Sequence, residues 1–122
     1  MRFVPSRKFG RISLSLDGSA HDIFTRAASQ IMKLAFKIAE TNPAPKEQTG
    51  EVTIFNRRRP SDSEISEEMS TEQLYDFIRM LDAETYPKAY ICSKGYRFNF
   101  DEANLSPAGN LSARVTITNI NK

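Results

Sequence analysis

The chain has 122 residues, of which 39% are hydrophobic and 26% charged, so it is neither disordered by composition nor embedded in a membrane. Its formal net charge of +2 is too small to indicate nucleic-acid binding by itself. The single cysteine, Cys92, cannot form an internal disulfide, and the basic start lacks the apolar core of a secretory signal, so we expect a cytoplasmic protein.

The first third of the chain predicts a short strand followed by a long helix. Ile12, Leu14 and Leu16 alternate with polar residues, the period of a half-buried strand. Ser19 is placed as an N-cap with Asp22 three residues later, an imperfect capping box. Apolar residues then recur at helical spacing, which predicts a helix from about residue 20 to 40, ended by two prolines.

The middle of the chain predicts a linker, a strand and a second helix. Residues 46–50 are polar, and Val52, Ile54 and Phe55 are expected to form a short apolar strand. Ser70 and Gln73 make an S-x-x-Q capping box, so we expect a helix from Ser70 that ends near residue 82 or 84.

The last third predicts a β-meander. Residues 89–92 and 96–100 flank a hairpin connection at 93–95 that contains a glycine, and residues 111–118 alternate in polarity. The fold class is therefore α+β: two helices with a short N-terminal strand and a small C-terminal antiparallel β-meander.

Chemistry-bearing residues are few. His21 is the only histidine, and we expect it to lie exposed in the first helical turn. Cys92 is predicted to be a small core residue of a strand and not a nucleophile. No cysteine–histidine set could bind zinc, and residues 17–19 are a turn with a cap, not a phosphate loop. We predict no catalytic residue and no metal ligand.

One segment resembles a known family. Residues 54–65, Ile-Phe-Asn-Arg-Arg-Arg-Pro-Ser-Asp-Ser-Glu-Ile, are similar to the F-x-R-R-x-P-x-D-S-x-I segment of the formyltransferase family. Residues 74–84 and the following Tyr-Pro-Lys-Ala at 86–89 resemble the family's helix and the turn into its C-terminal β-structure. Residues 14–20 are similar to the strand and helix start that close its catalytic domain. The resemblance implies that residues 1–48 correspond to the end of the catalytic domain and residues 49–122 to the C-terminal subdomain.

The catalytic signatures of that family are missing. The family uses an asparagine, a histidine in H-x-S-x-L-P and an aspartate in D-x-G-D, with 10-formyltetrahydrofolate as donor, and this sequence has neither motif. The resemblance therefore implies a chain that binds no cofactor alone, is not competent alone, and uses 10-formyltetrahydrofolate only in the complete enzyme. The chain is a truncated or separately encoded C-terminal part, or a relative that lost the reaction.

Five residues are candidates for substrate binding. The guanidinium groups of Arg57, Arg58 and Arg59 could meet a phosphate or carboxylate, or pair with acidic residues of the following turn at 62, 64 or 67. Tyr86 could stack on a base or pack on the second helix. Lys88 completes the candidate set.

Three hypotheses for function follow. The first is the accessory part of an N-formyltransferase acting on a sugar nucleotide or on methionyl-tRNA. We favour the sugar-nucleotide branch or an uncharacterised branch, because the C-terminal β-region is short and few basic residues follow Tyr86. The second is a stand-alone binding or interaction module. The third, ranked last, is a nucleic-acid-binding β-domain with Tyr90, Tyr96 and Phe98 as a stacking platform.

We also expect a partner, either a second copy in a homodimer or a catalytic formyltransferase domain. Met32 and Phe36 lie off the main apolar stripe of the first predicted helix and are expected to be left uncovered. The contact is therefore predicted near Ile12, Leu14, Met32 or Phe36, with no membrane involved.

Overall fold

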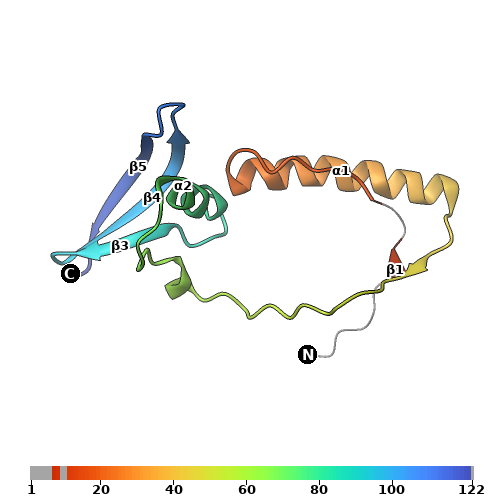
Figure 1. Ribbon diagram of the computed structural model, residues 1–122, viewed down its shortest axis with the longest axis horizontal. Coiled ribbons are helices and arrows are strands. Elements are labelled where there is room, and N and C mark those ends of the chain that lie inside the picture. Colours follow the sequence, from red (N-terminus) through yellow and green to blue (C-terminus); the bar gives the residue numbers. More distant parts are fainter. Residues whose placement is uncertain (1–6, 9–10, 122) are drawn as a thin grey trace. The chain divides into compact units, whose positions relative to one another are not determined.

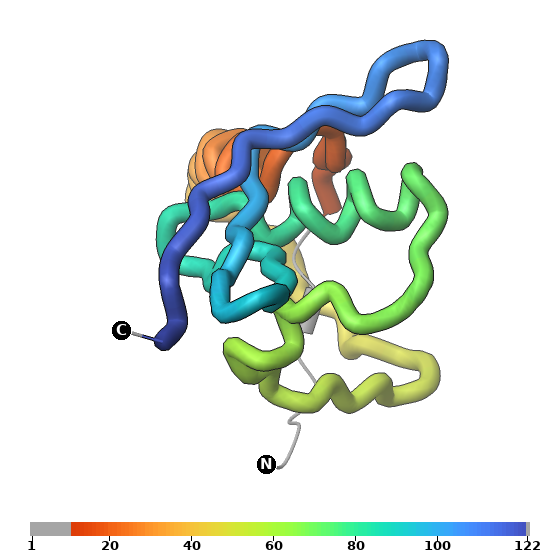
Figure 2. Tube along the Cα trace, turned by 90° about the vertical axis from the view of Figure 1, so that its left-hand side faces the viewer, coloured from red at the N-terminus to blue at the C-terminus, as the bar shows by residue number. Residues whose placement is uncertain are grey.

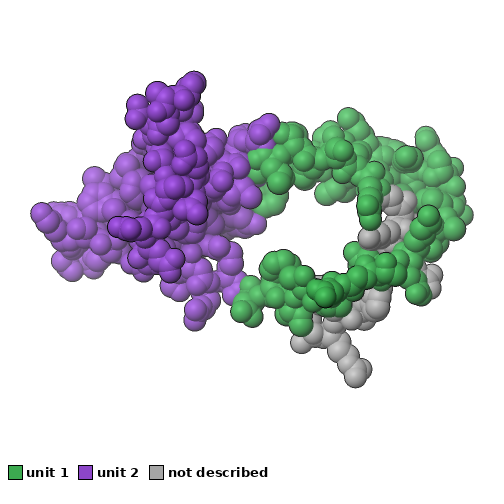
Figure 3. Space-filling view, viewed as in Figure 1, with its two compact units in different colours: residues 1–16, 23–56 green, residues 17–22, 57–122 purple. Residues whose placement is uncertain are grey.

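The computed structural model describes residues 7–8 and 11–121 (Figure 1). In chain order the elements are β1 (Arg7–Lys8), α1 (Ala20–Thr41), β2 (Lys46–Glu47), the 3-10 helix η1 (Pro60–Ser63), α2 (Thr71–Met80), β3 (Ala89–Ser93), β4 (Tyr96–Leu105) and β5 (Leu111–Asn119). The chain divides into two units: residues 1–16 with 23–56, and residues 17–22 with 57–122 (Figure 3). The predicted α+β class, with two helices and a C-terminal meander, is confirmed.

The first helix begins and ends where the sequence predicts. Ser19 Oγ accepts a hydrogen bond of 3.2 Å from the Asp22 N–H, and Asp22 Oδ2 accepts one of 3.0 Å from the Ser19 N–H. The capping box is therefore complete although aspartate replaces the usual glutamate. At the other end Asn42 has a φ of 40°, and its N–H donates to the Ile38 carbonyl oxygen at 2.8 Å before Pro43 stops the helix.

Two predicted strands are wrong. Residues 11–17, with the alternating Ile12, Leu14 and Leu16, have no regular structure, and residues 51–59 are likewise outside any strand. In both segments the apolar side chains are exposed, including Val52 and Phe55. The short N-terminal strand is instead β1, which pairs antiparallel with β2. An alternating sequence forms a strand only where a neighbour accepts its backbone hydrogen bonds, and no described residue does so here.

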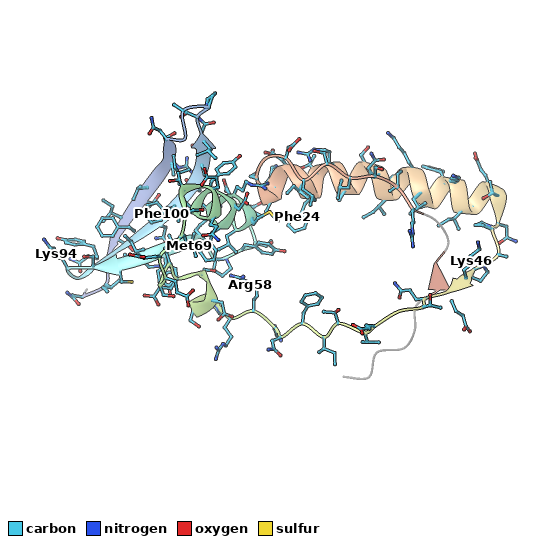
Figure 4. The ribbon with its side chains drawn as sticks, viewed as in Figure 1. Phe24, Lys46, Arg58, Met69, Lys94 and Phe100 are labelled. Atoms are coloured by element: carbon cyan, nitrogen blue, oxygen red, sulfur yellow. The ribbon has the colours of Figure 1, made fainter. Side chains whose placement is uncertain are left out.

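The second unit contains a three-stranded antiparallel sheet in the order β3-β4-β5. Lys94 and Gly95, both with positive φ, form the two-residue connection between β3 and β4, as the glycine predicts. Lys94 lies at the end of this hairpin in Figure 4. The meander is therefore confirmed, with β4 extending five residues beyond the predicted Phe100 to Leu105.

The core of this unit lies between α2 and one face of the sheet. α2 crosses β4 in both views (Figures 1 and 2). Ile78, Leu81 and Ala89 are buried, with Phe77 and Phe100 among the side chains around them. Full burial of a large apolar side chain is worth about 1.5–3 kcal/mol, so the buried Ile78 and Leu81 side chains each stabilise the unit by about that amount.

A β-bulge interrupts β4 beside the core. The register with β5 shifts between Asp101 and Asn104, and Glu102 has a φ of 51°. The Glu102 N–H, which the bulge removes from the ladder, donates a hydrogen bond of 2.9 Å to Asp82 Oδ2. Asp82, two residues after the end of α2, thereby holds the bulge in place. Among the described residues, no helix is long and apolar enough to cross a membrane.

Candidate anion-binding pocket

A pocket of about 900 Å³ lies entirely within the second unit, beside α2. Its wall is formed by the segment before and within η1, one side of α2, and the turn that leads to β3. The lining residues are Arg57, Arg58, Arg59, Pro60, Ser63, Gln73, Asp76, Phe77, Met80, Leu81, Thr85, Tyr86 and Pro87. We call this surface the arginine pocket.

The P-x-D-S sequence builds one wall of the arginine pocket. Asp62 Oδ2 accepts a hydrogen bond of 2.7 Å from the Arg59 N–H, and this closes η1 behind Pro60. The buried Ser63 donates its hydroxyl to the Pro87 carbonyl oxygen at 3.2 Å. The Ile65 N–H then donates to the Tyr90 carbonyl oxygen at 2.8 Å. These hydrogen bonds hold the segment that follows the three arginines, residues 60–65, against the start of β3.

The three arginines differ in what they contact. Arg59 pairs with Asp62 at 3.8 Å, as the alternative interpretation predicts. Arg58 Nη2 donates 3.0 Å to the Asp62 carbonyl oxygen, not to a carboxylate, and Arg58 lies two residues before η1, beside it in Figure 4. Arg57 makes no hydrogen bond or ion pair with any residue in the described ranges. Two guanidinium charges at the pocket therefore face no carboxylate within the described part of the chain.

One side of α2 forms the opposite wall, which sequence reasoning missed. Gln73, Asp76, Phe77 and Met80 line the pocket at helical spacing. Asp76 Oδ1 accepts 2.8 Å from Arg79 Nε, so the carboxylate is already neutralised. The sequence signal for this wall is Met80, an apolar residue that lies off the apolar face by which α2 packs on the core. In the structure the Met80 side chain is 44% exposed.

Tyr86 and Lys88 lie in different places. Tyr86 lines the pocket with Phe77 and Met80 and remains 41% exposed, so it forms part of the pocket surface beside α2. Lys88 is not among the lining residues, because its Nζ lies 2.8 Å from Asp82 Oδ1. The structure therefore brings together four of the five predicted binding residues.

The remaining chemistry-bearing residues do not extend the site. His21 is exposed at the start of α1, where its backbone N–H donates 3.0 Å to the Asp82 carbonyl oxygen. Cys92 is exposed on β3, so the prediction of a core position is wrong: the residue is three positions from the core residue Ala89 and therefore lies on the opposite face of the sheet. No group of three or more His, Cys, Asp or Glu residues in the described ranges is arranged to hold a metal ion.

The three aromatic residues of the β-domain hypothesis do not form one platform. In the β3–β4 register Tyr90 pairs with Asn99 and Ile91 with Phe98, so Tyr90 lies on the face opposite Phe98 and Tyr96. Tyr90 is also buried, with the Arg97 guanidinium 3.6 Å from its ring centroid. This arrangement argues against a stacking platform on the sheet.

Comparisons with known proteins identify relatives of this fold. Residues 60–118 match the family model described as methionyl-tRNA formyltransferase, C-terminal domain. A solved structure, the methionyl-tRNA formyltransferase from Clostridium thermocellum, is 41% identical with a TM-score of 0.81. The match covers 87% of this chain and 47% of that enzyme, so the chain spans about half its length. A search of curated proteins found no match.

Proposed function

We propose, from the premise that this chain belongs to the formyltransferase family as a C-terminal portion, that it serves a methionyl-tRNA formyltransferase as its accessory part. The observation that carries the proposal is the agreement in sequence and fold with the C. thermocellum enzyme over 87% of the chain. The resemblance found in the sequence is thus confirmed at the level of the family.

The acceptor we propose is methionyl-tRNA. Both the matching family model and the similar structure carry that substrate in their names, whereas the sequence alone favoured a sugar nucleotide. The arginine pocket supports an anionic acceptor of either kind, because guanidinium groups bind phosphate through paired N–H donors.

We propose that the formyl donor of the complete enzyme is 10-formyltetrahydrofolate and that this chain does not carry out the transfer alone. The residues present do not fit the reaction centre. His21, the only histidine, is exposed at a helix start and is not among the residues that line the arginine pocket. No step of the transfer is therefore assigned to this chain.

The catalytic part is the proposed partner. None of the described residues in 11–16 and 23–56 is buried, and large apolar side chains of α1 such as Ile31, Met32 and Phe36 are exposed. The C. thermocellum enzyme has about as much chain again, which could cover such a surface. A cytoplasmic location is part of this proposal, because the single cysteine leaves no internal disulfide to form.

A chimeric enzyme tests the proposal. The part of the C. thermocellum enzyme that this chain does not match is joined to the 122-residue chain, and formylation of methionyl-tRNA is measured. We expect the chimera to formylate methionyl-tRNA about tenfold or more faster than the catalytic part alone. Contacts distant from the reacting amine supply binding energy that lowers the activation barrier of the transfer. The 122-residue chain alone should show no turnover.

The controls separate the alternatives. Activity on amino-sugar nucleotides but not on methionyl-tRNA would replace the proposed acceptor. In another outcome, circular dichroism shows that the chimera is folded, yet the chimera is no more active than the catalytic part. That outcome would favour the hypothesis that this chain is a stand-alone binding module. Turnover by the isolated chain that survives His21→Ala would show that a reaction centre lies elsewhere in it.

A further inference from the structure

We propose that the arginine pocket binds one nucleoside phosphate unit, with the phosphate on Arg57 and Arg58 and the base against Phe77, Met80 and Tyr86. This deepens the proposed function and rests on it for the source of the nucleotide, an unpaired nucleotide of the RNA acceptor. The chemical class of ligand is argued from the pocket itself.

The charge of the pocket selects an anion. Arg57 makes no hydrogen bond or ion pair within the described ranges, and Arg58 donates one N–H to a backbone carbonyl oxygen. Asp76, the one carboxylate in the lining, is held by Arg79 at 2.8 Å. Arg79 cannot readily turn away, because its Nη1 also donates 2.9 Å to the Gly18 carbonyl oxygen. The positive charge of the arginines is therefore not cancelled within the pocket.

Arg59 can add to this positive charge, because breaking its ion pair with Asp62 costs little free energy. Its ion pair with Asp62 is 3.8 Å long, and the arginine side chain is 79% exposed. Exposed ion pairs of this kind contribute little to stability, so a phosphate could draw the guanidinium away. The η1 turn would survive, because the Asp62 carboxylate is also held by the Arg59 backbone N–H.

The apolar lining selects a ring. Phe77, Leu81 and two prolines form part of the pocket surface, and the exposed side chains of Met80 and Tyr86 extend it. An inorganic anion would leave this surface wet, whereas a planar base covers it and stacks on an aromatic ring. The pocket volume of about 900 Å³ lies within the range of about 300–1,000 Å³ that is usual for small organic ligands.

Polar groups at the wall favour the acceptor-rich edge of a base. Gln73 Oε1 accepts 3.0 Å from the Ser70 N–H in the capping box, which leaves the amide NH₂ of Gln73 as the group that can bind a ligand. The Thr85 hydroxyl, which also lines the pocket, can donate as well. Ring nitrogens and carbonyl oxygens of a base are suitable acceptors for both.

Calorimetric titration of the full 122-residue chain tests the inference with four probes: inorganic phosphate, adenosine monophosphate, uridine diphosphate and a single-stranded RNA tetranucleotide. We expect the nucleotides to bind about tenfold or more tightly than inorganic phosphate. The double variant R57Q/R58Q should weaken nucleotide binding about tenfold or more, because two charge-assisted contacts are lost. Tyr86→Ala should weaken adenosine monophosphate about fivefold or more and leave phosphate unchanged.

A matched control removes two positive charges outside the pocket. Lys33 on α1 and Lys94 at the hairpin are exposed and are not lining residues, so K33Q/K94Q should change nucleotide affinity less than about twofold. Equal losses in both double variants, or equal affinity for phosphate and nucleotides, would overturn the inference. Tighter binding of RNA than of uridine diphosphate identifies the RNA source, and the reverse order identifies a sugar nucleotide.

The chimera distinguishes failure of this inference from failure of the proposed function. If R57Q/R58Q leaves the KM of the chimera for methionyl-tRNA unchanged, the function stands and the pocket is not the acceptor subsite. If the chain binds nucleotides through the pocket but the chimera formylates no tRNA, the pocket assignment stands and the proposed function fails.

Discussion

Lys88 Nζ donates a hydrogen bond of 2.8 Å to Asp82 Oδ1, and this ion pair joins the end of α2 to the start of β3. The other oxygen of Asp82 accepts the N–H of Glu102 at the bulge of β4. Three elements therefore meet at one carboxylate. Lys88 serves this junction in the described chain, which explains why it does not line the arginine pocket.

The junction predicts a pH dependence of stability. Burial alone would raise the pKa of Asp82, but the Lys88 and Glu102 hydrogen bonds and the charges of Lys88 and Arg114 outweigh it and lower that pKa. The unfolded state then binds more protons than the folded state in acid. The stabilisation is present above pH of about 4 and is lost as pH falls through the lowered pKa of the folded state.

Asp82→Asn removes the titrating group. We expect the variant to lower the free energy of unfolding at pH 7 by about 1–2 kcal/mol and to flatten its decline below pH 4. Thermal unfolding followed by circular dichroism from pH 7 to 2.5 measures both. Glu84→Gln, which removes an exposed carboxylate without a hydrogen bond or ion pair to a described residue, is the control. Parallel curves for Asp82→Asn and the wild type would contradict the assignment.

The N-cap of α2 gives a second prediction. Ser70 Oγ accepts 3.1 Å from the Gln73 N–H, and the Gln73 side chain returns a bond to the Ser70 N–H. Ser70→Ala should lower the free energy of unfolding by about 1 kcal/mol, because an N–H in the first turn loses its acceptor. Chemical denaturation measures the loss, and Ser66→Ala, at an exposed serine without such a bond, should be close to neutral.

Local signals explain how much of the fold could be predicted. Ser19 and Ser70 begin helices as their capping boxes indicate, and Gly95 forms the hairpin turn. These features depend on neighbours within three residues. The strands predicted from the apolar patterns at residues 12–16 and 52–55 are not present. A strand needs a hydrogen-bonding partner from elsewhere in the chain, and a local sequence pattern does not show whether there is one.

The candidate site was predictable on one wall only. The cluster of arginines and Tyr86 indicated anion and ring binding, and these residues do line one pocket. The wall from α2 was missed because Gln73 and Asp76 look like ordinary solvated positions on a helix. Lys88 was assigned by proximity in sequence, yet the strand start directs it toward Asp82.

The exposure of Cys92 makes a third prediction. An exposed thiol on the face of β3 opposite the core should react fully with a disulfide reagent in native buffer, without unfolding. The measurement is the release of the coloured thiol product, with Cys92→Ala as the blank. A reaction that becomes complete only in denaturant would show that Cys92 is covered in solution.

The last prediction concerns the exposed apolar face of α1. Met32 and Phe36 are 56% and 64% exposed, as predicted, but Ile31 of the main stripe is 63% exposed as well, so the exposed face is wider than the sequence indicated. Burial of each side chain is worth about 1.5–3 kcal/mol, so we expect the isolated chain to form a dimer through this helix. Phe36→Ser should weaken the dimer about tenfold or more, because two copies of the ring leave the interface.

Sedimentation equilibrium over a wide concentration range measures the effect. Lys37→Ser, at the neighbouring exposed position, introduces the same serine and lowers helix propensity at least as much, without removing an apolar group, and should leave the dimer intact. Addition of the catalytic part of the C. thermocellum enzyme should convert the dimer into a mixed complex, because both partners compete for the same helix face. A monomer at high concentration, with Phe36→Ser leaving solubility, mass and binding of the catalytic part unchanged, would show that this face of α1 is not an interface.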